Sequence, residues 1–109
     1  IRQFNVYLDA QIVGGATIFE TETTAHVQYI SANSSKQTYG TLDFLFHSLL
    51  SEVFLDKWYF DFGTSNIALG SKVNSNLSYW KESFGARILV HRHFRVATEN
   101  YPLLNNVLV

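Results

Sequence analysis

The segment from residue 42 to residue 54 most constrains the fold, because its apolar residues recur with the period of an α-helix. They fall at i, i+3, i+4, i+7, i+8, i+11 and i+12: Leu42, Leu45, Phe46, Leu49, Leu50, Val53 and Phe54. This spacing puts all of them on one face of a helix, and Asp43 in the first turn suits the helix dipole. The rest of the chain must supply a layer that covers this face.

Three segments before the helix have the apolar, β-branched and aromatic composition of strands, at residues 4–8, 12–19 and 25–30. Residues 9–11 separate the first two and predict a hairpin. Gly14 and Gly15 within the second segment predict a bulge or the close approach of another backbone. Residues 25–30 alternate between polar and apolar, as a half-buried strand does.

After the helix, the pattern predicts a short aromatic strand at 58–62, a second helix at 71–84 capped by Ser71, and a long final strand at 87–96. The order β-β-β-α-β-α-β indicates an α+β fold, with helices packed on a mixed, mostly antiparallel sheet. Most of the larger aromatic residues are expected in its core: Tyr7, Phe19, Trp58, Phe60, Trp80 and Phe84. Residues 97–109 form a tail of unassigned structure.

The composition excludes several classes of protein. The chain has 109 residues, 47% of them hydrophobic and 16% charged, with a net charge of −1, which fits one globular domain or part of one. No basic stripe indicates nucleic-acid binding, and no apolar run approaches the roughly 18 to 20 residues of a membrane span. Without Cys there is no disulfide, thiol nucleophile or Cys-type zinc site. The chain lacks Met and begins at Ile1, so we expect a processed chain or a piece of a longer protein.

The polar loop that leads into the first helix is one candidate binding site. The start of a helix presents unpaired N–H groups that bind phosphates, Gly40 permits close approach, and Lys36, Gln37 and Thr41 add donors. This is not a Walker loop, and a plain polar connection between strand and helix explains the same residues.

Asp61 is the second candidate. It shares one face of its strand with Tyr59, while the flanking aromatic residues point to the other face. Partial burial would raise its pKa towards the range of a general base. Alternatively, Asp61 accepts hydrogen bonds from the turn at residues 63–65.

The four histidines carry weaker signals. His91 and His93 share a face of the predicted final strand at a spacing that a metal could use, but no third ligand is evident, so we predict an exposed strand face and no metal site. His26 and His47 are expected to be structural.

Four segments of the chain resemble a known family when they are taken together. They are Val13-Gly14-Gly15, residues 25–30 (Ala-His-Val-Gln-Tyr-Ile), residues 59–65 (Tyr-Phe-Asp-Phe-Gly-Thr-Ser) and residues 81–87 (Lys-Glu-Ser-Phe-Gly-Ala-Arg). Over residues 4–96 the chain resembles the C-terminal part of acyltransferases of the GNAT superfamily. The likeness is to the Fem-like branch, often met in bacterial pathways for envelope polysaccharides.

This resemblance implies a GNAT-like fold that binds acetyl-CoA, the acyl donor, where the two middle strands, 25–30 and 58–62, splay apart. The pantetheine arm would pair with the backbone of Gln28, Tyr29, Ile30 and Ser31, and Asn66 or Asn74 would reach its amides. The phosphates would be held by Lys36, Gln37, Tyr39, Gly40 and Thr41. The family's phosphate motif ends in Gly or Ala, and Leu42 stands there in this chain.

By the same resemblance, the chain is part of an N-acyltransferase that moves an acyl group to an amine, with an amino sugar as a candidate acceptor. Asp61 would be the base, and Tyr79 would protonate the departing thiolate. Residues 1–96 would be the C-terminal part of the domain, with the acceptor site completed by an N-terminal half in a cytoplasmic protein.

Two other functions remain open. One is an aminoacyl-tRNA-dependent transferase of the Fem type, against which the balanced charge argues. The other is a non-catalytic pseudo-acyltransferase or assembly module, in which the tail at 97–109 forms a docking or homo-oligomer contact.

Overall fold

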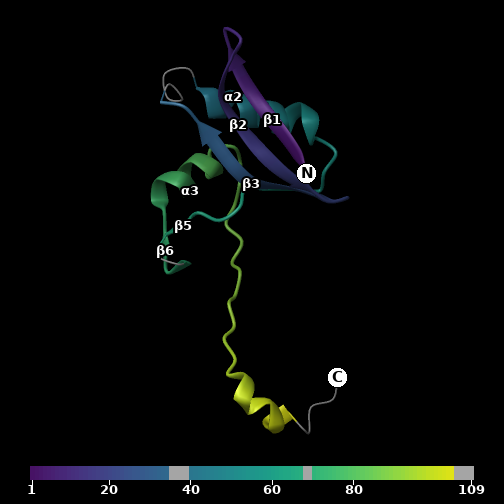
Figure 1. Cartoon of the computed structure of the whole chain (residues 1–109), viewed down its shortest axis with the longest axis vertical. Helices are drawn as coiled ribbons and strands as arrows, with labels where there is room; N and C mark the ends of the chain where they lie inside the picture. Colours follow the sequence, from purple (N-terminus) through teal and green to yellow (C-terminus); the bar gives the residue numbers. More distant parts are fainter. Residues whose placement is uncertain (35–39, 68–69, 105–109) are drawn as a thin grey trace.

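The computed structural model of the chain describes residues 1–34, 40–67 and 70–104 (Figure 1). Its elements follow in the order β1 (Arg2–Leu8), β2 (Gln11–Glu20), β3 (Thr24–Ala32), α2 (Thr41–Ser48), a π-helical turn (Leu49–Val53), β4 (Tyr59–Asp61), β5 (Asn66–Ile67), β6 (Lys72–Val73), α3 (Ser75–Glu82) and a 3-10 helix (Thr98–Leu104). The predicted α+β class is confirmed.

The main sheet has the strand order β1-β2-β3-β4, in which the first three strands are antiparallel and β4 runs parallel to β3. The predicted hairpin between β1 and β2 is confirmed. Asp9 and Ala10 both have positive φ, 50° and 65°, as a two-residue turn of type I′ requires. The register shifts once in each antiparallel pair, between Val6 and Tyr7 and between Thr17 and Ile18.

Gly14 and Gly15 lie where other atoms come too close for a side chain. A Cβ at Gly15 would lie 2.6 Å from the carbonyl oxygen of Phe4, and one at Gly14 would lie 2.8 Å from Cγ2 of Thr41. The predicted close approach of another backbone is confirmed at both positions: the paired strand β1 approaches Gly15, and the backbone of Ser31 in β3 approaches Gly14, on which the start of α2 also packs.

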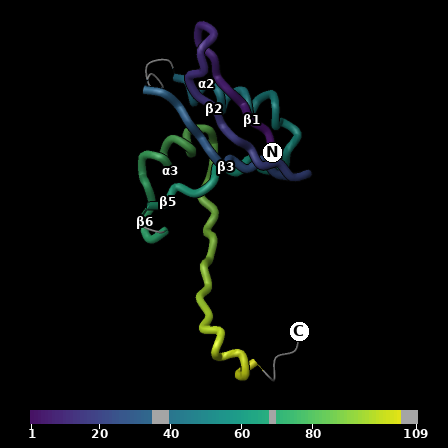
Figure 2. Tube along the Cα trace, in the orientation of Figure 1, coloured from purple at the N-terminus to yellow at the C-terminus, as the bar shows by residue number. Residues whose placement is uncertain are grey.

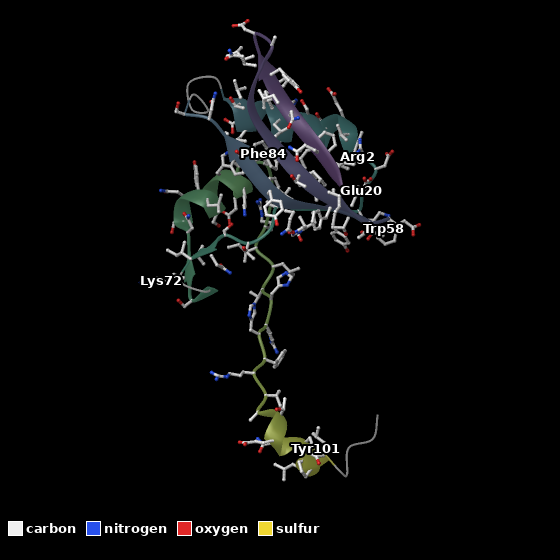
Figure 3. All side chains as sticks on the ribbon, viewed as in Figure 1. Arg2, Glu20, Trp58, Lys72, Phe84 and Tyr101 are labelled. Carbon is white, nitrogen blue, oxygen red and sulfur yellow. The ribbon has the colours of Figure 1, made fainter. Side chains whose placement is uncertain are left out.

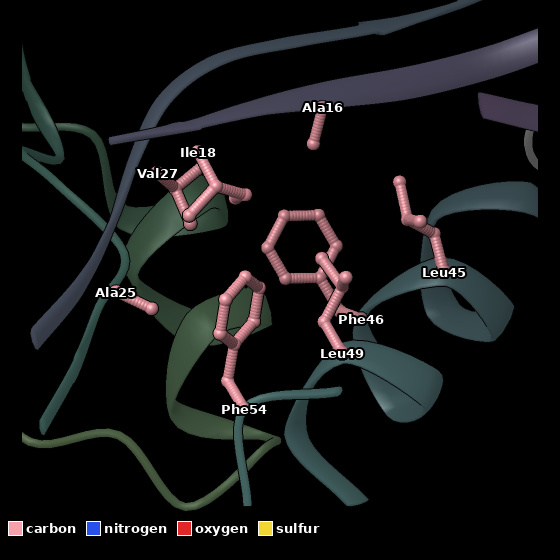
Figure 4. Close-up of a cluster of buried hydrophobic side chains, with 8 residues drawn as sticks. All are labelled: Ala16, Ile18, Ala25, Val27, Leu45, Phe46, Leu49 and Phe54. Carbon is pink, nitrogen blue, oxygen red and sulfur yellow. The ribbon is translucent and has the colours of Figure 1, made fainter. Parts of the chain in front are cut away.

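The core lies between one face of the main sheet and α2 (Figure 4). Phe46 is fully buried there, and its ring contacts those of Phe62 and Trp80 at centroid distances of 5.4 and 5.1 Å. The other buried apolar residues of this cluster are Ala16, Ile18, Ala25, Val27, Leu45, Leu49 and Phe54. One aromatic residue of α2 thus joins the helix to the segments that follow β4.

The predicted helix at 42–54 is confirmed, but its last turn is wider than an α-helical turn. The N–H of Phe54 donates to the carbonyl of Leu49, five residues earlier, at 2.9 Å. The extra residue in this turn rotates the face, so Phe54 is buried while Val53 is partly exposed. An ideal period of 3.6 residues would have placed both on the buried face.

The aromatic strand is shorter than predicted, and some of the aromatic residues predicted in the core are exposed. β4 begins at Tyr59, and Trp58 points into solvent beyond the edge of the core (Figure 3). Tyr7 and Phe19 are exposed as well, so their predicted core positions are wrong. Phe19 alternates with the buried Ile18 and so lies on the face of the sheet opposite the core, whereas Tyr7 lies close to the turn of the β1–β2 hairpin.

α3 begins at Ser75 rather than Ser71, because Lys72 and Val73 pair with β5 in a small hairpin. The cap is Asn74, whose Oδ1 accepts a hydrogen bond from the N–H of Leu77 at 3.2 Å. The helix ends at Glu82, and the turn that follows it closes at Gly85, whose φ of +93° favours glycine.

The predicted strand at 87–96 is wrong for this structure: these residues form an extended segment that leaves the fold without a pairing strand among the described residues (Figures 1 and 2). The polar–apolar alternation is present, but a strand also needs a neighbour. In the described part of the tail, residues 98–104 form an exposed 3-10 helix. Within the described residues, no helix has the length and apolar character needed to cross a membrane.

Candidate functional site

A cleft opens between β3 and β4 because the two strands pair over a short distance only. The paired positions are Thr24 with Tyr59, Ala25 with Phe60 and His26 with Asp61. Beyond these pairs β3 continues to Ala32, whereas the segment that follows β4 turns away from β3 after Asp61. The cleft has a volume of about 670 Å³, within the range of small-molecule sites.

The walls of the cleft come from four parts of the chain. β3 contributes Val27, Gln28 and Ile30, and α3 contributes Leu77, Trp80 and Lys81. Gly63 and Thr64 line it after β4, and Gly40, Leu42 and Asp43 line it at the start of α2. Helix starts, a strand edge and an apolar wall therefore face one space.

His26 and Asp61 form a hydrogen-bonded pair next to this cleft. Because they are register partners on parallel strands, their side chains lie on the same face of the sheet, opposite the core. His26 Nδ1 lies 2.8 Å from Asp61 Oδ2, and the N–H of Gly63 donates to Asp61 Oδ1 at 2.8 Å. The carboxylate therefore holds the imidazole by Nδ1 and leaves Nε2 as the ring nitrogen for other partners.

The predicted rise in the pKa of Asp61 is wrong. Partial burial does raise it, but the hydrogen bonds from Gly63 and His26 outweigh burial and lower the pKa below its usual range. Asp61 thus stays ionised and orients His26 instead of accepting a proton itself. The other interpretation of Asp61, as an acceptor for the turn at Gly63, is confirmed by the hydrogen bond from that N–H.

Lys81 is a buried amine in the wall of the cleft. Lys81 is only 6% exposed, and its Nζ donates to the carbonyl of Thr64 at 2.7 Å and to that of Gly63 at 3.4 Å. Burial lowers the pKa of Lys81, and the charge of Asp61 acts in the opposite direction. The amine thereby fixes the loop that follows β4.

The start of α2 presents unpaired hydrogen-bonding groups near the cleft. Gly40 has a left-handed conformation and precedes the first turn, whose leading N–H groups have no helical acceptor. Thr41 is 3% exposed, and its Oγ1 has no hydrogen-bond partner among the described residues. Asp43 accepts a hydrogen bond from Trp80 Nε1 at 2.8 Å, which ties α2 to α3.

The predicted donor-binding residues divide between two faces of the sheet. Gln28, Ile30 and Gly40 line the cleft. Tyr29 and Ser31, which alternate with Gln28 and Ile30, line a shallow groove of about 320 Å³ on the opposite face, and Ile30 reaches this groove as well. The predicted phosphate ligands Lys36, Gln37 and Tyr39 lie outside the described residues.

Three more predicted site residues lie outside the lining of the cleft, as Thr41 and Asp61 also do. Asn74 caps α3 and also donates its N–H to the carbonyl of Ser65 at 2.6 Å. Asn66 is exposed on β5. Tyr79 is 77% exposed, because a rotation of about 100° per residue turns it outward when Trp80 faces inward.

Sequence reasoning missed two residues of the site: His26, which was expected to be structural, and Lys81. His26 and Asp61 are 35 residues apart, and only the register of the parallel strands joins them. Lys81 had a local signal: it lies four residues after Leu77, so a cation interrupts the apolar face of the predicted helix.

The cleft therefore combines a buried amine, a helix start and an apolar wall, and an imidazole fixed by a carboxylate lies beside it. This set suits an elongated ligand with an anionic end near α2 and a reacting end near His26. Comparisons of the chain with protein-family models, with curated proteins and with solved structures found no match.

Proposed function

We propose that this chain is the donor-binding part of an acyl-CoA-dependent N-acyltransferase of the GNAT type, with acetyl-CoA as the donor. The observation that carries the proposal is the separation of β3 from β4 directly after the His26–Asp61 pair. The lining of the resulting cleft includes Gly63, beside that pair, and Gly40, at the start of α2.

The unpaired edge of β3 supports binding of the pantetheine arm. Beyond His26, β3 runs on towards Ala32 without a strand beside it on the β4 side among the described residues. An extended ligand with amide groups can add to such an edge as a further strand does. We assign the backbone of residues 28–31 to these amides, and the apolar side chains of Ile30 and Leu77 to the arm itself.

The start of α2 supports binding of the phosphates. Its free N–H groups favour anions, and the buried Oγ1 of Thr41 lacks an acceptor or donor of its own among the described residues. We assign the phosphates to Gly40 and Thr41, together with Lys36, Gln37 and Tyr39. Asn66 or Asn74 remains the candidate for the pantetheine amides; both lie outside the lining of the cleft, and Oδ1 of Asn74 already caps α3.

The chemistry assigned to the chain is proton removal from the acceptor amine. Bound acyl-CoA supplies an activated acyl carbonyl. His26 takes the amine proton at Nε2, and Asp61 keeps the ring oriented and stabilises the imidazolium that forms. Tyr79 stays the candidate acid for the departing thiolate; its hydroxyl lies on the exposed outer face of α3, outside the lining of the cleft.

The open face of the sheet beside this pair is assigned to the acceptor, for which an amino sugar of envelope polysaccharide is the candidate. Its groove carries amide and hydroxyl groups from Asn5, Thr17 and Ser31, and the ring of Tyr29. The remaining contacts would come from an N-terminal half of the protein, and use of acyl-CoA would put the protein in the cytoplasm.

A titration of the ¹⁵N-labelled chain with acetyl-CoA tests the donor site residue by residue. We expect amide shifts at Gln28, Gly40 and Gly63, with no shift at Tyr101 in the tail. Acetylated pantetheine alone should move Gln28 and Gly63, whereas adenosine 3′,5′-bisphosphate alone should move Gly40. An absence of shifts at millimolar acetyl-CoA, or shifts confined to other residues, would contradict the proposal.

A further inference from the structure

We propose that residues 87–96 form a strand on the open edge of β4 in a second copy of this chain, so that two copies exchange strands in a dimer. In the described structure β4 is the last strand of the main sheet, and its outer edge has no paired strand. The proposal is independent of the acyltransferase function.

The segment at 87–96 is the most exposed apolar stretch of the described chain. Val90 is 80% exposed and Phe94 is 84% exposed, and Ile88, Leu89 and Val96 are exposed to a similar degree. The segment leaves the body of the fold in an extended form (Figure 3). An extended apolar stretch of this kind is a template for pairing with another strand.

The two faces of the segment match the two faces of β4. On the core side of the sheet, Phe60 and the following Phe62 are partly buried, whereas Asp61 is exposed on the opposite side. In the segment, one alternating set is largely apolar, with Arg92 as the exception: Ile88, Val90, Phe94 and Val96. The other set is largely basic or polar: Arg87, Leu89, His91, His93 and Arg95. One of the two possible alternations of the paired segment therefore places its apolar side chains beside Phe60 and Phe62 and its basic side chains beside Asp61.

The charge distribution favours pairing of residues 87–96 with the folded body of another copy over pairing with residues 87–96 of that copy. Arg87, Arg92 and Arg95 are three of the eight Lys and Arg residues, and the segment holds none of the nine Asp and Glu residues. The remainder of the chain thus has five cationic and nine acidic residues, a net charge of −4. Two segments side by side would repel each other, whereas a segment on the body is attracted. His91 already lowers the pKa of Asp61 through its charge, next to the edge in question.

The end of α3 favours exchange between copies over folding back onto the same copy. The N–H groups of Ser83, Phe84 and Gly85 are all bonded to carbonyls of the last turn, and Phe84 stacks on Phe62 in the core. Gly85 then takes a left-handed conformation that directs the chain outward. Pairing within one copy would require this fixed ending to change.

The absence of cysteine allows a direct test by cross-linking, with engineered pairs on the intact chain. Chains carrying Tyr59→Cys are mixed with chains carrying Leu89→Cys, His91→Cys or His93→Cys, and oxidised. We expect at least one mixture to give a cross-linked species of twice the 12.5 kDa chain mass, with Tyr101→Cys as a negative control. Cross-links that form only within a doubly substituted chain of single mass would overturn the proposal.

Sedimentation of the unmodified chain gives a second test. We expect a reversible dimer whose dissociation constant rises at least tenfold in Phe94→Ser and less than twofold in Tyr101→Ser, an equally exposed aromatic residue outside the segment. A chain that sediments as a monomer at all concentrations overturns the proposal. So does a dimer that Tyr101→Ser weakens as much as Phe94→Ser does, because the tail would then be the contact.

Discussion

Truncation of Phe46 to alanine should destabilise the fold more than any change on the outer side of the same helix. The side chain is fully buried, and its ring lies within 6.2 Å of those of Phe60, Phe62, Trp80 and Phe84. Loss of a buried Phe costs about 3 to 5 kcal/mol, which includes the cavity left behind. We expect about 4 kcal/mol, because the surrounding rings come from β4, α3 and the residues that follow each of them, and cannot all close on the space.

This loss is large compared with the stability of a small domain. At roughly 0.05 to 0.15 kcal/mol per residue, the packed part of the chain is stable by about 4 to 13 kcal/mol. With a urea dependence of about 2 kcal/mol per molar, the unfolding midpoint of Phe46→Ala should fall by about 2 M. The more conservative Phe46→Leu should lower it by about 1 M and keep the chain folded if the alanine variant is not.

Urea unfolding followed by far-UV circular dichroism measures both variants. The matched control is Phe44→Ala on the same helix, where the side chain is 63% exposed and the expected change is under about 0.5 kcal/mol. Equal midpoint shifts for Phe44→Ala and Phe46→Ala would refute the reasoning, since the structure gives the two rings opposite environments.

Three other predictions follow from single contacts. Because the pKa of Asp61 is lowered in the fold from about 3.8, its ionised form stabilises the chain above about pH 5, and this stability is lost as the pH falls through the folded pKa. In Asp61→Asn, the temperature of the unfolding midpoint should therefore fall less steeply as the pH is lowered below about 5. An unchanged fall would contradict the stabilising role of ionised Asp61. Asn74→Ala should cost about 1 kcal/mol in urea unfolding by removing the α3 cap, whereas Asn76→Ala within the helix should cost nothing. Gly14→Ala should destabilise by about 1 to 3 kcal/mol through contact with Thr41 Cγ2, and Thr41→Ser should recover part of the loss in the double variant.

The sequence predicts the elements whose signals are local. The apolar period of residues 42–54 predicts α2, and the segments around Asp9 and Ala10 predict the first hairpin, because each pattern depends on neighbours within a few residues. Gly14 and Gly15 likewise predicted a close approach before its partners were known. The cleft between residues 25–30 and 58–62 was expected from the resemblance alone.

The remaining features depend on contacts between distant segments, which periodicity does not carry. His26 joins Asp61 only because Thr24 pairs with Tyr59, and a register shift of one residue would turn one of the two side chains to the other face. The strand predicted at 87–96 has the right alternation, but alternation reports two chemically different faces and not the presence of a neighbour. The π turn before Phe54 is invisible to a period of 3.6 residues.

The core and the cleft depend on the same aromatic contacts. Phe62 stacks on Phe46 at 5.4 Å, and Trp80 packs against both rings, so the residue after β4 is drawn towards α2 and α3. The same displacement takes the chain away from β3 directly after Asp61, which ends the strand pairing and opens the cleft. Trp80 also donates to Asp43 and thereby holds the start of α2 at the cleft's edge. Because Phe62 and Trp80 belong both to this cluster and to the lining of the cleft, substitutions at either residue would change the shape of the cleft as well as weaken the core.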